Sequence, residues 1–179
     1  MHPFQIHYNK VIQQDLLLSE NVSTASMLSS PKKISLCLGG DRSDESYVVS
    51  SLAALKILSG QKPYVTQQKF VQQRDRSPRE AVGGKVTLRG PIMYIFWYKL
   101  LFNVLPRIRQ FEGLRPPAHE KLYCFLLKDM FVFEELVPLF TYFEDLGSLQ
   151  CQFYFTTKSK AEAIVLGHSL QLCLLPNEN

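Results

Sequence analysis

The side chains best suited to chemistry lie in one short alternating stretch, Lys85-Val86-Thr87-Leu88-Arg89. In a strand, Lys85, Thr87 and Arg89 would share one face, while Val86 and Leu88 would be buried on the other. The guanidinium of Arg89 can give two donors to a phosphate or a guanine edge, and Thr87 can reach a phosphate or a 2′-hydroxyl. These side chains could contact a nucleic acid, but a solvent-facing sheet would show the same alternation.

Positive charge is concentrated in the middle of the chain. Residues 62–115 hold eleven basic and three acidic side chains, a balance of +8, whereas residues 1–61 are neutral overall and residues 116–179 carry −4. A basic segment between neutral and acidic ends is an electrostatic footprint for a polyanion. The alternative is a basic surface that is merely solvated, and charge alone slightly favours that alternative.

The sequence does not contain a recognisable catalytic or metal-binding motif. The run Gly83–Thr87 lacks the spacing of a phosphate-binding loop, and the histidines are too scattered to suggest metal ligands. No two cysteines have zinc or redox spacing, and their apolar surroundings predict small buried thiols in a reducing compartment. The cysteines are Cys37, Cys124, Cys151 and Cys173. We therefore expect no catalytic residue, no metal and no cofactor.

Signals for membranes and for targeting are also missing from the sequence. It has no run of roughly eighteen apolar residues, as a spanning helix would need. The start, Met1–Lys10, has neither the apolar core of a secretory signal nor the Arg-rich pattern of a transit peptide. We expect no membrane partner.

Hydrophobic periodicity and capping residues predict the elements that position these side chains. The expected helices are Asn9–Leu18, Ser46–Leu58 with Gly60 as its stop, Ile92–Val104 between Pro91 and Pro106, and one capped by Ser159 that runs to Leu170. The expected strands are Lys33–Leu38, Tyr64–Thr66, Lys85–Arg89, Tyr123–Leu127, Phe131–Phe133 and Leu149–Thr156. Because no regular βαβ repeat is present, an α+β fold with a mainly antiparallel sheet is predicted.

The length of the chain predicts a single domain, residues 1–179. Within it, Gln67–Val82 is a long polar stretch with four cations. A loop of this length is uncommon in a compact domain unless it has a function.

Five blocks in the middle of the sequence carry a resemblance to a known family. They are Leu58–Pro63, Lys85–Gly90, Met93-Tyr94, Leu105–Arg109 and Phe111–Leu114. In this order and at these intervals they resemble the universal large-subunit ribosomal protein five family, the 5S rRNA binders. That family typically shows SGQKP, KVTLRG, RMYEF, LPRIRDFRGL and a Thr-rich strand near the C-terminus. The resemblance covers roughly residues 7–170.

The start of the chain points to an organellar version of the family. His7-Tyr8 and the stretch Gln14–Leu18 are similar to versions that plant and algal mitochondria encode. The resemblance therefore implies a structural constituent of the mitochondrial large ribosomal subunit, in the matrix, rather than an enzyme. It also implies a sheet with helices on one face and 5S rRNA on the other.

The resemblance further implies a set of binding residues. Those expected to contact 5S rRNA and adjacent large-subunit rRNA in the central protuberance are Lys33, Gln61, Lys62, Lys85, Thr87, Arg89, Arg107 and Arg109. The loop Gln67–Val82 corresponds to the family's loop toward the P-site tRNA, and its cations are spaced to follow a sugar–phosphate backbone. They are Lys69, Arg74, Arg76 and Arg79. A tip beyond Gly113-Leu114 corresponds to the bridge to a small-subunit protein, and other ribosomal proteins are expected as neighbours.

Three departures from the family pattern affect these contacts. Cys37 replaces an asparagine expected at 5S rRNA, and a thiol cannot make amide contacts. Glu112 replaces an arginine, and Pro117–Leu122 replace a glycine-rich FDGRGN stretch at the tip. Two other hypotheses stay open: a free-standing RNA-binding or RNA-processing module, and a small enzyme using Cys37 or His168. The enzyme would need an orienting third residue, which the sequence does not supply.

Overall fold

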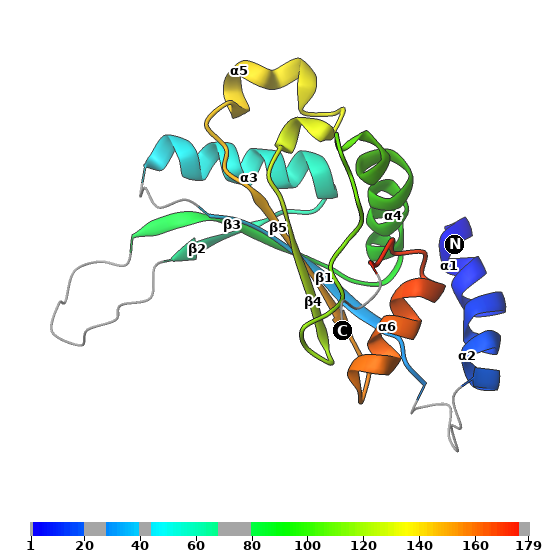
Figure 1. Cartoon of the computed structure of the whole chain (residues 1–179). Helices are drawn as coiled ribbons and strands as arrows, with labels where there is room; N and C mark the ends of the chain where they lie inside the picture. Colours follow the sequence, from blue (N-terminus) through cyan, green and yellow to red (C-terminus); the bar gives the residue numbers. More distant parts are fainter. Residues whose placement is uncertain (1, 20–27, 40–43, 68–79, 176–179) are drawn as a thin grey trace, which may run out of the picture. The chain divides into compact units, whose positions relative to one another are not determined.

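A five-stranded sheet is the centre of the computed structural model, which describes residues 2–19, 28–39, 44–67 and 80–175 (Figure 1). The strand order is β2-β3-β1-β5-β4, and β2 pairs antiparallel with β3. The strands are β1 (Pro31–Gly39), β2 (Tyr64–Gln67), β3 (Ala81–Leu88), β4 (Leu122–Leu127) and β5 (Leu149–Phe155). The predicted α+β class with a mainly antiparallel sheet is confirmed.

The helices are α1 (Pro3–His7), α2 (Gln13–Ser19), α3 (Glu45–Ser59), α4 (Gly90–Lys99), α5 (Phe140–Phe143) and α6 (Lys160–Ser169). Helices α2, α3, α4 and α6 lie where the sequence predicted helices, whereas α1 and α5 were not predicted. π-helical turns at Tyr8–Ile12 and Leu100–Val104 continue α1 and α4, and a 3₁₀ turn at Leu105–Arg107 contains Pro106. Gly60 ends α3 in the left-handed conformation, with φ 67°, and Ser159 caps α6 by accepting from the Glu162 amide at 3.3 Å.

The chain divides into two compact units, and the division falls within β1, β4 and β5. The first unit comprises Met1–Ile34, Arg89–Phe125 and Gln152–Asn179. The second unit comprises Ser35–Leu88 and Leu126–Cys151. The single domain expected from the length of the chain stays a prediction.

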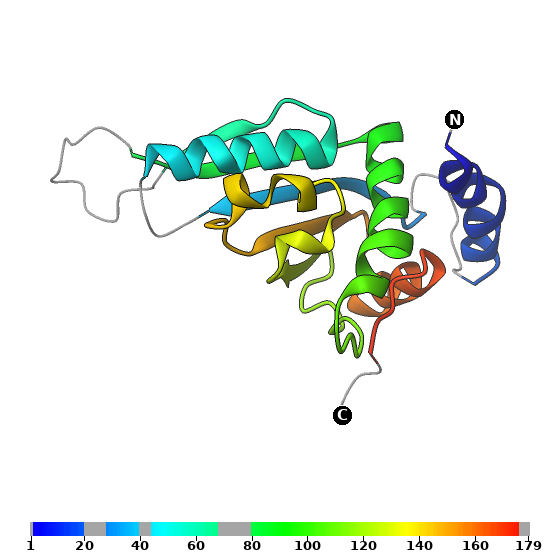
Figure 2. The same ribbon diagram turned by 90° about the horizontal axis from the view of Figure 1, so that it is seen from above.

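In the second unit, α3 packs on β3 (Figure 2). A Cβ added to Gly84 would lie 3.0 Å from Leu52 Cδ2 and 3.0 Å from Leu55 Cδ1, so helix and strand approach as closely as a glycine allows. Val86 and Leu88 alternate with Gly84 and are fully buried. The helix therefore covers the face of β3 that these three residues share.

In the first unit, α4 packs on β5 through aromatic side chains. The ring of Trp97 meets the ring of Phe153 edge-on at 4.8 Å, and Phe155 lies 6.2 Å from the same indole. Phe4 and Tyr8 pack on Tyr94, with ring centroids 6.4 Å and 5.8 Å away. Helices thus cover one face of the strands in this unit as well, as predicted.

Several predicted boundaries are wrong. Phe131–Phe133 was expected to be a strand, but Met130–Val132 form a 3₁₀ turn in which the Phe131 amide donates to the Asp129 carboxylate at 2.8 Å. Arg89 was expected to end a strand, but β3 stops at Leu88 and Arg89 is the N-cap residue of α4. The first helix begins at Pro3 rather than at Asn9, because Phe4 and Tyr8 supply buried aromatic anchors before Val11.

Candidate nucleic-acid interface

One polar surface in the second unit lies on β2 and β3, opposite to α3. It consists of Tyr64, Thr66, Lys85 and Thr87, and we call it the β2–β3 face. Lys85 and Thr87 alternate with the buried Val86 and are themselves half-buried, as the sequence predicted. Tyr64 is the cross-strand partner of Lys85, so the two side chains leave the sheet on the same side.

Gln61 and Lys62 precede β2 in the turn after α3. The Gln61 amide nitrogen donates to the Thr87 carbonyl at 3.2 Å, which ties this turn to β3. Gln61 therefore has a structural role next to Thr87. Lys62 is exposed, and Arg89, which directly follows β3, is exposed at the start of α4.

A second polar surface lies on β1 and β5 in the first unit. It consists of Lys33, Gln152 and Tyr154, and we call it the β1–β5 face. The Lys33 ammonium stands 4.3 Å from the centre of the Tyr154 ring, and the Tyr154 hydroxyl donates to the Gln152 carbonyl oxygen at 3.1 Å. Phe153, between Gln152 and Tyr154, points to Trp97 on the covered face. The β1–β5 face is therefore the face opposite to α4.

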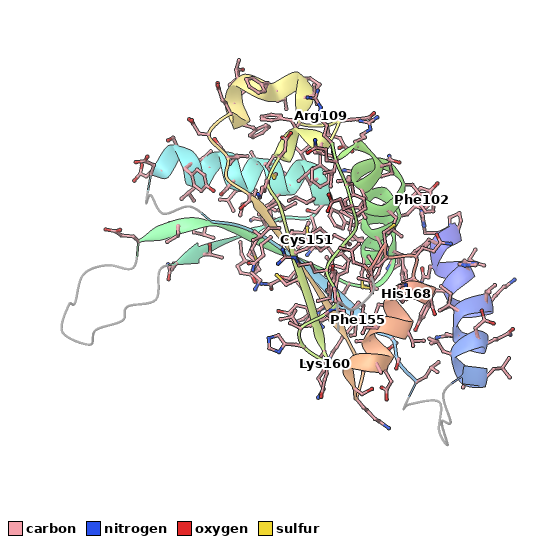
Figure 3. The ribbon with its side chains drawn as sticks, viewed as in Figure 1. Phe102, Arg109, Cys151, Phe155, Lys160 and His168 are labelled. Carbon is pink, nitrogen blue, oxygen red and sulfur yellow. The ribbon has the colours of Figure 1, made fainter. Side chains whose placement is uncertain are left out.

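The remaining predicted cations lie outside the strands. Arg107 and Arg109 follow α4, at and after the 3₁₀ turn, and both are exposed. Figure 3 shows the position of Arg109. The four loop cations lie outside the described residues; they are Lys69, Arg74, Arg76 and Arg79. At the ends of the predicted loop, Gln67 belongs to β2, and Ala81 and Val82 belong to β3.

Thr156 and Thr157, which the resemblance aligns with the family's Thr-rich strand, make hydrogen bonds within the fold. The Thr156 hydroxyl lies 2.7 Å from the Ser30 hydroxyl and donates to the Ser30 carbonyl at 3.0 Å. Thr157 is buried and donates to the Glu120 carbonyl. These bonds hold the start of β1 and the segment before β4 against the end of β5.

The geometry gives little support to the enzyme hypothesis. Cys37 is half-buried on β1, and His168 is exposed on α6 (Figure 3). Within the described ranges, no three His, Cys, Asp or Glu side chains gather closely enough to hold a metal ion. Burial raises the pKa of Tyr94 and of Tyr123 far above the usual phenol value, so both stay uncharged.

The predicted environment of the cysteines is largely wrong. Cys151 is buried on the covered face of β5, but Cys124 and Cys173 are exposed. Cys124 alternates with the buried Tyr123 on β4, so it takes the outward position although its neighbours in sequence are apolar. In the described part of the chain, no helix is long and apolar enough to span a membrane.

Sequence reasoning missed Tyr64, Gln152 and Tyr154. Strand alternation could have placed all three on polar faces, since Gln152 and Tyr154 flank the aromatic Phe153. The contact between Tyr154 and Lys33 could not be found in this way, because these residues lie on different strands at opposite ends of the chain.

The sequence is also similar to that of known proteins. The family model for the C-terminus of the ribosomal L5 family matches residues 81–172. Large ribosomal subunit protein uL5 of Mycoplasma pneumoniae is 30% identical over 183 residues, covering 98% of this chain and 99% of that protein. Large ribosomal subunit protein uL5m of Reclinomonas americana is 31% identical over 180 residues, covering 97% and 98%. The protein uL5 of Thermotoga sp. is 33% identical over 141 residues, covering 76% and 77%.

Proposed function

The chain belongs to the family of large ribosomal subunit protein uL5, and we propose that it binds 5S rRNA and adjacent large-subunit rRNA through its uncovered sheet faces. Membership in this family makes it a ribosomal protein of the large subunit that associates with rRNA and other ribosomal proteins. The identity of the RNA and the residues that contact it belong to the proposal.

The observation that supports the proposal best is the polarity of β3. Helix α3 covers Gly84, Val86 and Leu88, so Lys85 and Thr87 lie on the opposite face of the strand. A cation and a hydroxyl on a strand, followed directly by an exposed arginine, can contact phosphates, 2′-hydroxyls and a base edge together. The +8 balance of residues 62–115 adds long-range attraction for RNA.

We place the protein in the mitochondrial ribosome. The relative from Reclinomonas americana, named uL5m, matches nearly the whole chain. Bacterial relatives match with similar identity, so identity alone does not decide the compartment. The resemblance of His7-Tyr8 and Gln14–Leu18 to mitochondrially encoded versions supports the organellar assignment.

Two further partners belong to the proposal. The basic loop would face the P-site tRNA, and the tip beyond Gly113-Leu114 would contact a small-subunit protein. At the tip, Glu112 reverses a charge of the family pattern and Pro117–Leu122 replace its glycine-rich segment. We therefore expect the bridge to be weaker than the contact with 5S rRNA.

The test is to purify the chain from its own cells, to sediment it through a gradient and to sequence the RNA that copurifies. Cosedimentation with large subunits and enrichment of 5S rRNA are the expected results. A free monomer that carries other RNAs would favour the alternative, a free-standing RNA-binding or RNA-processing module. Mitochondrial fractionation of the same cells tests the proposed compartment.

A further inference from the structure

We infer that Tyr154 and Tyr64 each stack on an unpaired nucleobase, and that Lys33 and Lys85 bind the phosphate attached to it. This inference rests on the proposed RNA-binding function and specifies the kind of RNA bound: single-stranded or looped nucleotides, rather than a duplex held by its phosphates alone. The two tyrosines lie in different units of the chain.

Tyr154 lies on β5 beside a lysine that is already in place. The Lys33 ammonium stands 4.3 Å from the centre of the ring, which is a cation–π position. A phosphate binds an ammonium through charge-assisted hydrogen bonds, which are stronger than its attraction to a ring. A nucleotide that approaches can therefore draw Lys33 to its phosphate and leave the Tyr154 ring for its base.

The neighbouring Gln152 adds a directed donor. The Tyr154 hydroxyl donates to the Gln152 carbonyl oxygen at 3.1 Å, which fixes the orientation of the amide. The amide nitrogen then carries two hydrogens that can donate to a base carbonyl or to a phosphate oxygen. The Tyr154 ring can thus stack on the base, the Lys33 ammonium can bind the phosphate, and the Gln152 amide can donate to the base carbonyl or to a phosphate oxygen.

On β2, Tyr64 is likewise a tyrosine with a lysine as its neighbour. Its ring is 52% exposed, and Lys85 is its partner directly across the strand pair. Opposed residues on antiparallel strands have their Cβ atoms about 4.5–5.5 Å apart, so ring and ammonium can contact the same nucleotide. The face opposite to these residues is covered by α3, so Tyr64 has no role in the core.

Aromatic rings on an open sheet face beside cations are a general means of binding unstacked bases, because every base has a π-face. A solvent-facing sheet has no such requirement for aromatic rings. The two lysines were predicted from the sequence as RNA contacts, and each of them proves to have a tyrosine as its neighbour.

The experiment compares Tyr154→Leu and Tyr64→Leu with a matched control, Tyr142→Leu. Tyr142 is 73% exposed on α5 and belongs to neither polar face. Affinity is measured at fixed salt for two probes, a 5S rRNA transcript and a fully paired RNA duplex. Because each variant loses a base stack, Tyr154→Leu and Tyr64→Leu should bind the 5S transcript about 5-fold to 140-fold more weakly than the native protein. Both should bind the duplex with unchanged affinity. The control Tyr142→Leu should bind both probes like the native protein.

Tyr154→Phe and Tyr64→Phe separate stacking from the hydroxyl. Both variants should bind the 5S transcript with an affinity within a few-fold of the native one, because phenylalanine still stacks. Tyr154→Phe should lose only the part of the affinity that depends on the hydrogen bond from the Tyr154 hydroxyl to Gln152. As a readout that does not depend on stable variants, iodouridine-substituted 5S rRNA is cross-linked to the native protein and the attachment sites are mapped. Cross-links at Tyr154 and Tyr64 are expected.

Leucine variants that bind the 5S transcript as tightly as Tyr142→Leu would overturn the inference and leave the proposed function standing. Equal weakening of duplex and 5S binding, or cross-links confined to other residues, would overturn it too. If the native protein bound neither probe, the proposed function itself would be wrong.

Discussion

Replacing Gly83 by alanine should destabilise the strand that carries Lys85 and Thr87. A Cβ at this position would collide with the Leu38 carbonyl oxygen of β1, and would lie 3.0 Å from the Gly39 Cα. Both obstacles are backbone atoms of a paired strand, so rotation of a side chain cannot relieve the collision. β1 and β3 would have to separate locally.

Alanine substitutions at Gly84 and Gly39 are suitable controls, because an added Cβ meets fewer obstacles at these positions than at Gly83. At Gly84, the added Cβ would lie 3.0 Å from a terminal methyl group of Leu52 and of Leu55, which can rotate, and 3.5 Å from the Ser51 hydroxyl oxygen. At Gly39, no atom lies within 4 Å of the added Cβ, so alanine fits there without a contact. Overpacking costs about 1–3 kcal/mol, and we expect Gly83→Ala near the upper end, Gly84→Ala near the lower end and Gly39→Ala close to zero.

Urea unfolding followed by circular dichroism measures these differences, and thermal unfolding gives an independent value. For a chain of this length, each kcal/mol lowers Tm by about 2–4 °C, so a cost of about 3 kcal/mol should lower the Tm of Gly83→Ala by roughly 6–12 °C. Affinity for 5S rRNA should fall as well, since β3 is displaced. If Gly83→Ala is as stable as Gly39→Ala, the close approach of β1 and β3 is wrong, and so is the position of the β2–β3 face.

Three other predictions concern RNA. Arg89→Ala should weaken 5S rRNA binding by about 1–3 kcal/mol if the guanidinium forks onto a base, with Arg89→Lys intermediate; a folded Arg89→Ala with native affinity would contradict this. Affinity should fall steeply with salt, with a slope of about −0.9 per phosphate neutralised on a duplex and about −0.7 on a single strand, and a flat titration would refute the electrostatic footprint. Reversing the loop cations to glutamate should lower retention of P-site tRNA while the protein still assembles into large subunits, and failed assembly of a folded variant would make the loop an rRNA anchor instead. The four positions are Lys69, Arg74, Arg76 and Arg79.

Local features of the sequence predicted much of this protein, because they depend on neighbours along the chain. The alternation of Lys85, Val86 and Thr87 set their opposite directions before any fold was known, since side chains on a strand alternate. Gly60 and Ser159 marked the end of α3 and the start of α6 through their own backbone and side-chain chemistry. Short runs failed, because three residues such as Phe131–Phe133 cannot distinguish the period of a strand from that of a 3₁₀ turn.

Tertiary structure decided which face of each strand stays uncovered and which distant side chains share it. The alternation of the strand predicts that Lys85 and Val86 point to opposite faces. The packing of α3 against Gly84 determines which of these faces a helix covers. The Lys33 ammonium lies over the Tyr154 ring because β1 and β5 are neighbours in the sheet, although the chain between them contains the other three strands. Strand order depends on how the whole set of apolar surfaces is buried together, and no local pattern of residues contains that information.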